Sequence, residues 1–206
     1  MIPVEAIRQA VQGETPAPLR WAPRQAAGLT RVRQAAVLVP VLAPENASDN
    51  APLELLFIVR PQDASKHAGQ VAFPGGVADD DDYGPVETAL REAEEELGIP
   101  RQRPEILGLL PPFPTHTGFV IRPVVGLIRG PLPLVPSPTE VAATFTVPLS
   151  ELFDPARRRV MRSRWGPGLP EYPLWFWPFT PTPIWGATGH ILATLLTRLT
   201  RLEETR

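Results

Sequence analysis

Cysteine is absent from this chain of 206 residues. Its absence excludes disulfide bonds, thiolate metal sites and a cysteine nucleophile. A basic surplus is also lacking, because 20 lysines and arginines stand against 22 acidic residues and the formal net charge is −2. Proteins that bind along a phosphate backbone need such a surplus to release counterions, so we do not expect nucleic acid as a partner.

Long apolar runs are missing as well. No stretch approaches the roughly 20 consecutive apolar residues that a membrane-spanning helix requires. The N-terminal sequence, MIPVEAIRQAVQGETP, carries charges among its apolar positions and lacks the apolar core of a signal peptide. We therefore expect a cytoplasmic protein that has no membrane partner.

What the chain does contain is enough apolar material for one core. Hydrophobic residues make up 43% of it, and its length suits one domain with embellishments better than two. We assign residues 1–33 to an N-terminal extension and residues 34–206 to the main domain. Prolines cluster in residues 111–138 and 167–183, where we expect ordered loops and short strands because proline disfavours helix.

Short apolar segments rich in valine and leucine predict a β-sheet. Residues 34–42 and 53–59 are expected to form a hairpin with a long connecting loop. Residues 69–78 hold a short strand that breaks at a Pro-Gly-Gly turn. Three further strands are expected at residues 105–110, 120–128 and 142–147. Helices are expected at residues 3–12, 85–97 and 185–202. Strands with helices between and after them imply an α/β fold, a mixed sheet covered by helices.

The helix expected at residues 85–97 has recognisable ends. Pro85 is preorganised for the first helical position, and Glu87 places an acid in the first turn. Gly98 is a natural C-terminal stop. This helix is therefore the most firmly predicted element between the strands.

Three carboxylates on this helix indicate a candidate metal site. Glu92, Glu95 and Glu96 are spaced i, i+3 and i+4, so they share one face. Like charges at this spacing repel one another, and a bound cation would relieve the repulsion. A charged, solvent-facing side of the helix is the alternative, and for Glu94, which points about 100° away, it is the preferred interpretation.

A glycine turn just before the helix favours the metal site. Gly75 and Gly76 permit positive φ angles and a close approach of a ligand to the backbone. Oxygen ligands suit Mg²⁺ or Mn²⁺, and Mg²⁺ is usually held by one or two carboxylates together with substrate phosphates.

The sequence REAEEELGI, residues 91–99, fits R-E-U-x-E-E-x-G-U, where U is aliphatic, and so resembles the core of the Nudix hydrolase signature. That signature also has a glycine, five residues, an acid and seven residues before the arginine. Here Gly76 is followed after five residues by Asp82, and eight residues separate Asp82 from Arg91. The resemblance implies a Nudix fold, a mixed sheet sandwiched between helices (α/β/α), and metal-dependent hydrolysis of a diphosphate bond.

The resemblance also implies roles for individual residues. The Mg²⁺ or Mn²⁺ ligands would come from the turn and the helix: Gly76, Glu92, Glu95 and Glu96. Arg91 would hold the glutamates in place, and Glu95 would ligate a second ion or orient the attacking water. Nudix enzymes often use a further carboxylate from a later loop as base or ligand, and Glu140 is the candidate here.

A second segment, residues 60–76, resembles the one that marks the coenzyme A pyrophosphatases of this superfamily. Arg60, Gly69 and the Phe-Pro-Gly-Gly turn match in position, whereas Ser65 replaces the segment's second arginine. The resemblance implies cleavage of coenzyme A or acyl-CoA into 3′,5′-ADP and (acyl-)4′-phosphopantetheine. Candidate contacts to this small, nucleotide-like substrate are Arg60, Lys66 and His67.

Other interpretations remain open. Ser65 leaves room for another diphosphate substrate, such as ADP-ribose, a dinucleotide polyphosphate or a damaged nucleoside triphosphate. A Nudix-fold module that binds a nucleotide without cutting it is a rival of a different class, although such modules typically lose the carboxylates that this chain keeps. A homodimer is compatible with the sequence.

Three further features are interpreted as structural. Asp79–Asp82 is taken as a solvated loop, with a bond from Asp82 to Arg91 or a helix cap as the alternative. His190 is expected in the core or at an interface. The aromatic residues 175–179 are expected to pack against the C-terminal helix, and stacking on an adenine is the alternative.

Overall fold

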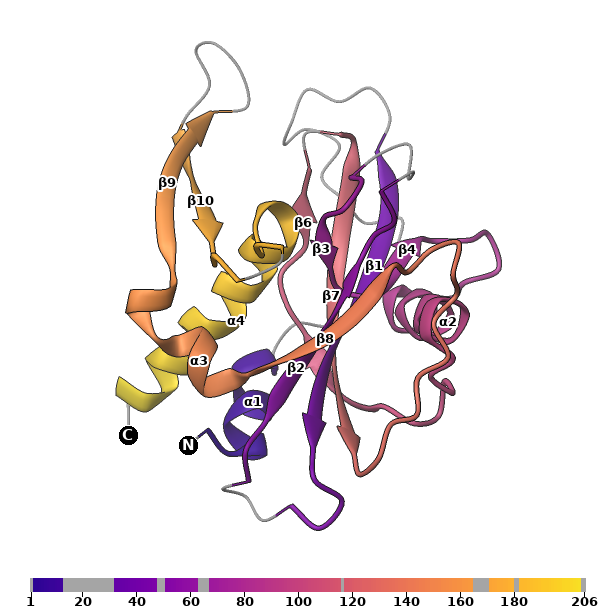
Figure 1. Cartoon of the computed structure of the whole chain (residues 1–206), viewed down its shortest axis with the longest axis horizontal. Coiled ribbons are helices and arrows are strands. Elements are labelled where there is room, and N and C mark those ends of the chain that lie inside the picture. The colour runs from indigo at the N-terminus through magenta and orange to yellow at the C-terminus, as the bar shows by residue number, and fades with distance from the viewer. Residues whose placement is uncertain are drawn as a thin grey trace.

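The computed structural model describes residues 2–12, 32–47, 51–62, 67–115, 117–164, 171–179 and 182–204, and all structural statements below concern these residues. Figure 1 shows their arrangement. The elements in chain order are α1 (Val4–Val11), β1 (Arg33–Ala43), β2 (Glu54–Val59), β3 (Val71–Ala72), β4 (Gly75–Val77), α2 (Pro85–Leu97), β5 (Glu105–Leu109), β6 (Phe113–Pro114), β7 (Phe119–Arg129), β8 (Ala143–Pro148), α3 (Leu149–Phe153), the 3-10 turn η1 (Pro155–Arg157), β9 (Arg159–Arg164), β10 (Glu171–Phe176) and α4 (Gly186–Glu204).

The central sheet has the strand order β3-β2-β1-β7-β5, with β4 paired to β1, β6 to β7 and β8 to β2. Strands β1 and β7 run parallel from Arg33 opposite Phe119 to Ala43 opposite Arg129. The other pairings in this sheet are antiparallel, including the hairpin of β1 and β2. The predicted mixed sheet and hairpin are therefore confirmed.

Helices cover both faces of this sheet (Figure 1). Successive side chains of a strand point to opposite faces, so Leu38 belongs to the core beneath α2 and Val39 to the core beneath α1 and α4. Ala89 and Ala93 of α2 are fully buried against the sheet, and their small size lets the helix lie close to it. The α/β/α arrangement is confirmed.

Helix α1 is part of the larger core. Its residues Val4, Ile7 and Val11 are buried in the same cluster as α4, and Arg198 of α4 donates a hydrogen bond to the carbonyl oxygen of Ala10 at 3.0 Å. The helix expected at residues 3–12 is thus present and packed. Where the extension ends and the main domain begins stays a prediction.

A second, two-stranded sheet lies beside α4 (Figure 1). Its strands β9 and β10 pair antiparallel from Arg164 opposite Glu171 to Arg159 opposite Phe176. Trp177, which follows β10, is fully buried and donates from Nε1 to the carbonyl oxygen of Leu152 at 3.2 Å. The proline-rich stretch after residue 170 therefore contains a strand and a buried tryptophan, in line with the short strands expected there.

None of the helices in the described ranges combines the length and apolarity needed to cross a bilayer.

Candidate active site at helix α2 and the glycine turn

Helix α2 begins at Pro85 and ends at Leu97, as predicted. Gly98 follows with a φ angle of 68°, and its amide donates back to the carbonyl oxygens of Ala93 and Glu94. A left-handed residue at this position closes the helix and satisfies its last carbonyl groups. The start and stop signals of the sequence therefore fix which turn of the helix carries the carboxylates.

The glycine turn lies directly against the carboxylate face of α2. In β4, Gly76 pairs with Ala36 of β1, and β4 packs against α2. A Cβ atom at Gly76 would overlap the carboxylate of Glu92. Glycine is thus needed here for close approach, and the backbone of the turn lies in contact with one of the candidate metal ligands.

Arg91 joins the carboxylates to this turn. Its Nη1 donates to Glu92 Oε1 at 2.9 Å and to Glu95 Oε2 at 3.0 Å, and its Nη2 donates to the carbonyl oxygen of Val77 at 3.0 Å. A planar guanidinium can hold several acceptors in fixed directions. This geometry fits the orienting role expected for Arg91.

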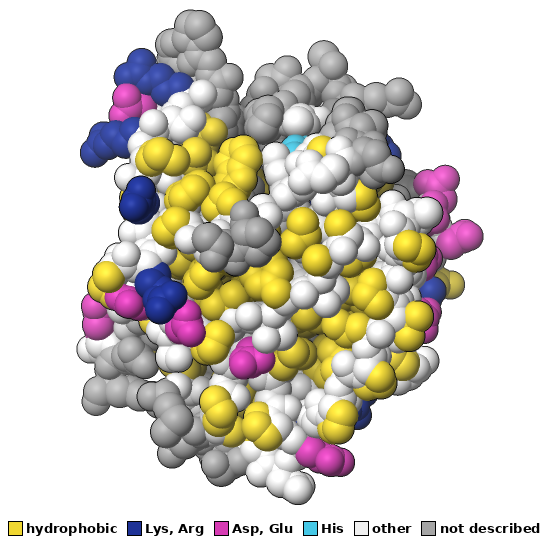
Figure 2. Space-filling model, viewed as in Figure 1, with side chains coloured by type: hydrophobic (Ala, Val, Ile, Leu, Met, Phe, Trp, Pro, Cys, Tyr) yellow, Lys and Arg dark blue, Asp and Glu magenta, His cyan; other side chains and the backbone are white. Residues whose placement is uncertain are grey.

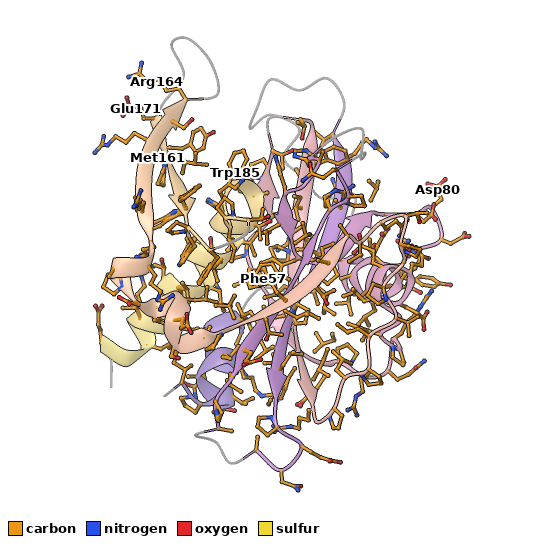
Figure 3. The ribbon with its side chains drawn as sticks, viewed as in Figure 1. Phe57, Asp80, Met161, Arg164, Glu171 and Trp185 are labelled. Carbon is orange, nitrogen blue, oxygen red and sulfur yellow. The ribbon has the colours of Figure 1, made fainter. Side chains whose placement is uncertain are left out.

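Asp82 corrects one interpretation from the sequence. Its side chain is only 4% exposed and accepts from Arg91 Nε at 3.2 Å, Arg91 Nη2 at 3.0 Å and Thr88 Oγ1 at 2.9 Å. The preferred solvated loop is wrong for Asp82, and the alternative bond to Arg91 is right. Asp80, by contrast, points outward at the edge of the molecule (Figure 3).

The loop before α2 forms a closed turn at Asp79–Asp82. The amide of Asp82 donates to the carbonyl oxygen of Asp79 at 3.2 Å, and the amide of Asp79 donates to Asp82 Oδ2 at 2.9 Å. This closed turn directs the Asp82 carboxylate back to the helix. Burial alone would raise the pKa of Asp82, but the hydrogen bonds from Arg91, Asp79 and Thr88 outweigh it and lower the pKa.

Glu96 is the most deeply placed of the three glutamates. It is 4% exposed, and its Oε2 accepts from the Gly75 amide at 2.9 Å. Burial, together with the charges of Glu92 and Glu140, raises the pKa of Glu96 to about 8. Burial also raises the pKa of Glu92, to which the charges of Glu95 and Glu140 contribute. The cluster therefore holds more negative charge than its surroundings compensate.

Glu140 lies on an exposed turn that is attached to α2. The Ser137 amide donates to the Glu96 carbonyl oxygen at 2.8 Å, and the Glu140 amide donates to the Ser137 carbonyl oxygen at 3.1 Å. The Glu140 carboxylate is close enough to raise the pKa of both Glu92 and Glu96. The turn thus brings Glu140, the candidate chosen from the sequence, close to Glu92 and Glu96. The chemical role of Glu140 stays a prediction.

The described residues contain no group of three or more histidine, cysteine or acidic side chains already gathered as metal ligands. The hydrogen bonds explain why, since Glu92 is drawn to Arg91 and Glu96 to the Gly75 amide. The donor set nevertheless fits a hard divalent cation, because it consists of oxygen atoms, carries excess negative charge and is partly shielded from water.

Two of the candidate substrate contacts, Arg60 and His67, are described and lie between β2 and β3. Arg60 is held at the strand end, since its amide donates to the Gln70 carbonyl oxygen at 3.0 Å, and its charge opposes part of the rise in the pKa of Glu96. His67 is exposed, has a φ angle of 60°, and places Nδ1 3.0 Å from Gln70 Oε1. Lys66 and Ser65 lie outside the described residues.

Two polar groups of the site were not singled out from the sequence. Thr88 is fully buried and bonds to Asp82, and the Gly75 amide bonds to Glu96. Thr88 could have been found, because it lies four residues before Glu92 on the same side of the helix. The backbone amide gave no signal in the sequence.

The remaining aromatic and histidine residues pack as expected. Trp175 and Phe179 lie against the larger core, with the Trp175 and Trp177 rings 6.3 Å apart. His190 is half-buried and stacks on Phe113 at a centroid distance of 4.2 Å. These contacts give the rings a structural role beside α4.

Comparison with known proteins identifies the family. Residues 32–165 match the family model described as NUDIX domain. A protein named as the uncharacterized Nudix hydrolase NudL of Photorhabdus laumondii is 40% identical over 161 residues, 78% of this chain and 81% of that protein. The protein of the same name from Pectobacterium atrosepticum is 49% identical over 121 residues, 59% of this chain and 60% of that protein, so that match spans about three fifths of the relative.

Solved structures agree on the fold. The Nudix hydrolase RenU from M. smegmatis covers 86% of this chain and 89% of its own at a TM-score of 0.52, with 19% identity. At this identity the likeness speaks for the fold alone. The family match over 32–165 and the NudL relatives, together with the carboxylates that α2 retains, establish that the chain belongs to the Nudix hydrolases.

Proposed function

We propose that this Nudix hydrolase cleaves the diphosphate linkage of coenzyme A or acyl-CoA to 3′,5′-ADP and (acyl-)4′-phosphopantetheine. One observation carries the proposal. Arg60, from the segment that resembles the coenzyme A pyrophosphatases, lies near enough to the carboxylates of α2 for its charge to oppose part of the rise in the pKa of Glu96. This proximity supports a single site that joins the subfamily segment to the carboxylates of α2, where a cationic side chain suits an anionic diphosphate.

Nudix hydrolases generally use divalent metal ions, and the residues that would hold Mg²⁺ or Mn²⁺ here are Gly76 through its carbonyl oxygen, Glu92, Glu95 and Glu96. When bound, the ions would neutralise charge developing on the phosphate oxygens and lower the pKa of the attacking water. Arg91 keeps Glu92 and Glu95 oriented toward the turn through its bonds to both.

Glu140 is the proposed base. It is exposed on its turn and stands near Glu92 and Glu96, so it can reach a water molecule at the edge of the carboxylate cluster. A carboxylate in that position would accept the proton of the water that attacks phosphorus. The alternative role is that of an additional metal ligand.

Recognition of the 3′-phosphate would separate coenzyme A from most other Nudix substrates. Lys66 and His67 follow Arg60 in the sequence and are the proposed contacts. A charge-assisted contact contributes about 1.5–3 kcal/mol, which is roughly a factor of ten to a hundred in kcat/KM. We expect coenzyme A to be cut more efficiently than dephospho-coenzyme A, and Lys66→Ala to shrink that preference more than it slows cleavage of the dephospho compound.

The test is a substrate panel. The protein is incubated with Mg²⁺ or Mn²⁺ and coenzyme A, acetyl-coenzyme A, dephospho-coenzyme A, ADP-ribose or a dinucleotide polyphosphate, and products are identified by mass. The proposal expects 3′,5′-ADP from coenzyme A at the highest kcat/KM. A preference for ADP-ribose would overturn it and would mean that Ser65, in place of the subfamily's second arginine, marks a change of substrate.

A further inference from the structure

Strand β8 forms an open edge of the central sheet. It pairs with β2 from Ala143 opposite Val59 to Pro148 opposite Glu54, and among the described residues it pairs with no other strand. The register runs along the whole of β8 without a shift. An edge strand of this kind presents a row of backbone donors and acceptors that another strand can bind.

Other edge strands of the molecule are protected. β5 has a register shift between Ile106 and Gly108 and lies against α1, where a Cβ atom at Gly108 would overlap Val11. β3 is only two residues long, and three of the six residues of β9 are arginines. Bulges, short strands, charges and covering helices all keep an edge from pairing with another chain. β8, in contrast, has no charged side chain, and its only proline is its last residue.

The pairing with β2 fixes which backbone groups of β8 point outward. Leu149, which directly follows β8, donates its amide to the Leu53 carbonyl oxygen at 2.8 Å. Hydrogen-bonded positions alternate along an antiparallel pair, so Phe145 also directs its amide and carbonyl groups toward β2. The N–H and C=O groups of Thr144 and Thr146 therefore point away from the sheet.

These open groups are spaced for pairing with a second copy of the same strand. With a two-fold axis at Phe145, Thr144 of one copy lies opposite Thr146 of the other, and each such antiparallel pair can exchange two backbone hydrogen bonds. The side chains agree with this pairing, because a threonine opposite a threonine is a favourable cross-strand pair. Residues 141–150 include no charged side chain, so two copies bring no like charges together along the strand.

The surface around β8 suits the same partner. β8 runs across the front of the view in Figure 1, and Figure 2 shows mainly hydrophobic and uncharged atoms over the middle of that face. Acidic side chains lie toward the α2 side of the face, and arginines lie toward the β9–β10 hairpin. A centre depleted of charge inside a polar rim is the composition of a protein–protein interface.

We propose that two copies of this chain associate through β8, antiparallel and about a two-fold axis at Phe145, so that their central sheets become one continuous sheet. The open backbone groups of Thr144 and Thr146 are then bonded to the other copy. The turn that carries Glu140 leads into β8, so the two active sites stand at opposite ends of this interface. The dimer forms whichever diphosphate the enzyme cuts.

The mass and the amide exchange of the unchanged protein give the first test. Sedimentation equilibrium should give twice the 22.6 kDa of one chain. Hydrogen–deuterium exchange, followed for each residue by NMR, should find the Thr144 and Thr146 amides protected in the dimer and exchanging faster after dilution. The Phe145 amide is bonded within the chain and is the internal control, which should stay protected throughout.

Two results of these measurements would overturn the proposal. One is a protein that is still monomeric at about 100 μM, an affinity too weak for a stable dimer. This result would also be the outcome if the edge receives a strand of another protein. The second is a dimer in which the Thr144 and Thr146 amides exchange freely, because the copies would then meet through another surface.

Charged side chains on the strand give the second test. Thr146→Lys places a cation on the open edge and should raise the Kd of the dimer at least about tenfold, since charges on an edge strand oppose pairing. Thr144→Glu should have a similar effect. When the two substitutions are combined, opposite charges face each other across both pairs, so the Kd should return to within about threefold of the wild type. A combined variant that dimerises no better than either single variant would overturn the proposed register.

A matched control separates pairing from a general effect of charge. Thr197→Lys adds the same charge at an exposed position of α4 and should leave the Kd unchanged. Both lysine variants should keep the melting temperature that the wild type has when diluted to the monomer, because each replaces an outward-facing threonine. An equal loss of dimer in Thr197→Lys would show that β8 is not the interface.

Discussion

Asp82 and Arg91 form the most enclosed ion pair in the described part of the chain, with side chains 4% and 14% exposed. The two side chains still pair although one residue more than in the Nudix signature separates Asp82 from Arg91. The hydrogen bonds that Arg91 donates to Asp82 raise the pKa of Arg91 above its usual range, so the guanidinium stays charged at any working pH. In this chain the loop before α2 brings the Asp82 carboxylate to Arg91.

Asp82→Asn tests this pair. The substitution keeps size but removes the charge facing Arg91, so the free energy of unfolding should fall by about 1–3 kcal/mol. The pKa of Asp82 is lowered in the folded state, so its contribution is present above the unfolded pKa and is lost as pH falls through the folded value. Urea unfolding at pH 7 and at pH 3 should therefore show a smaller loss at pH 3. Asp80→Asn, on the exposed part of the loop, should be neutral at both.

Glu92 and Glu96 carry the second prediction at this scale. Glu96→Gln keeps an oxygen atom that can accept from the Gly75 amide, but it removes the negative charge that a hard cation needs. Turnover should fall by at least about a hundredfold, as for groups that act mainly in the transition state. Glu94→Gln is the control, because Glu94 faces away and pairs with Arg101 at 2.7 Å. Near-normal turnover in both Glu92→Gln and Glu96→Gln would disprove the assigned metal site.

At the scale of elements, the C-terminal end of α2 decides where Glu96 lies. Gly98 adopts a φ angle of 68°, a conformation that costs other residues about 1–2 kcal/mol. Gly98→Ala should lower the unfolding free energy by about that amount, measured by thermal or urea unfolding. Gly98→Asn adds the same Cβ atom but tolerates the left-handed conformation better, so it should lose less. Equal losses would show that the Cβ atom, and not the backbone angle, sets the cost.

Helix α4 contains a titratable side chain in its packed face. Burial lowers the pKa of His190, which stacks on Phe113 of β6. In the unfolded chain the imidazole binds a proton more readily, so stability is present above the unfolded pKa, about 6.5, and is lost as pH falls through the folded value. The melting temperature of the wild type should drop between pH 7 and pH 5 more than that of His190→Phe. His190→Gln loses the stacked ring, so its melting temperature should be lower at both pH values. That temperature should change as little between pH 7 and pH 5 as the melting temperature of His190→Phe.

Across the whole molecule, charge is distributed unevenly. Figure 2 shows acidic side chains along the edge formed by α2 and the loop before it, and arginines along the opposite edge at the β9–β10 hairpin. The hairpin arginines Arg162 and Arg164 pair locally with Glu171. They lie on the opposite edge from the carboxylates of α2, whose negative charge is offset in part by Arg91 and would be offset further by a bound cation.

Metal binding should therefore stabilise the protein as a whole. A cation present at about a hundred times its Kd adds about 2.7 kcal/mol by mass action. For a chain of this size that is roughly a 5–10 °C rise in melting temperature. Replacing Glu92, Glu95 and Glu96 together with Gln should abolish the rise seen with Mg²⁺ or Mn²⁺. A rise of the same size in the triple variant would place the ion elsewhere.

Local rules determined the elements of this protein. Pro85 and Gly98 set the ends of α2, and the i, i+3, i+4 spacing alone put Glu92, Glu95 and Glu96 on one face. The period of the apolar segments gave the strands of the central sheet and α4. These features depend on interactions within a few residues, so they can be read without knowing what packs against them.

Only the tertiary structure decided which groups meet at the site. From the sequence, the bond between Asp82 and Arg91 is only an alternative, and neither the bond from the Gly75 amide to Glu96 nor the nearness of Arg60 to that carboxylate can be foreseen. Each of these contacts joins residues on different elements, and their positions follow from how β2, β4 and the 137–142 turn stack around α2. Burial has the same origin: Glu96 and Glu94 are chemically identical and two residues apart, and packing alone buries one and exposes the other in part.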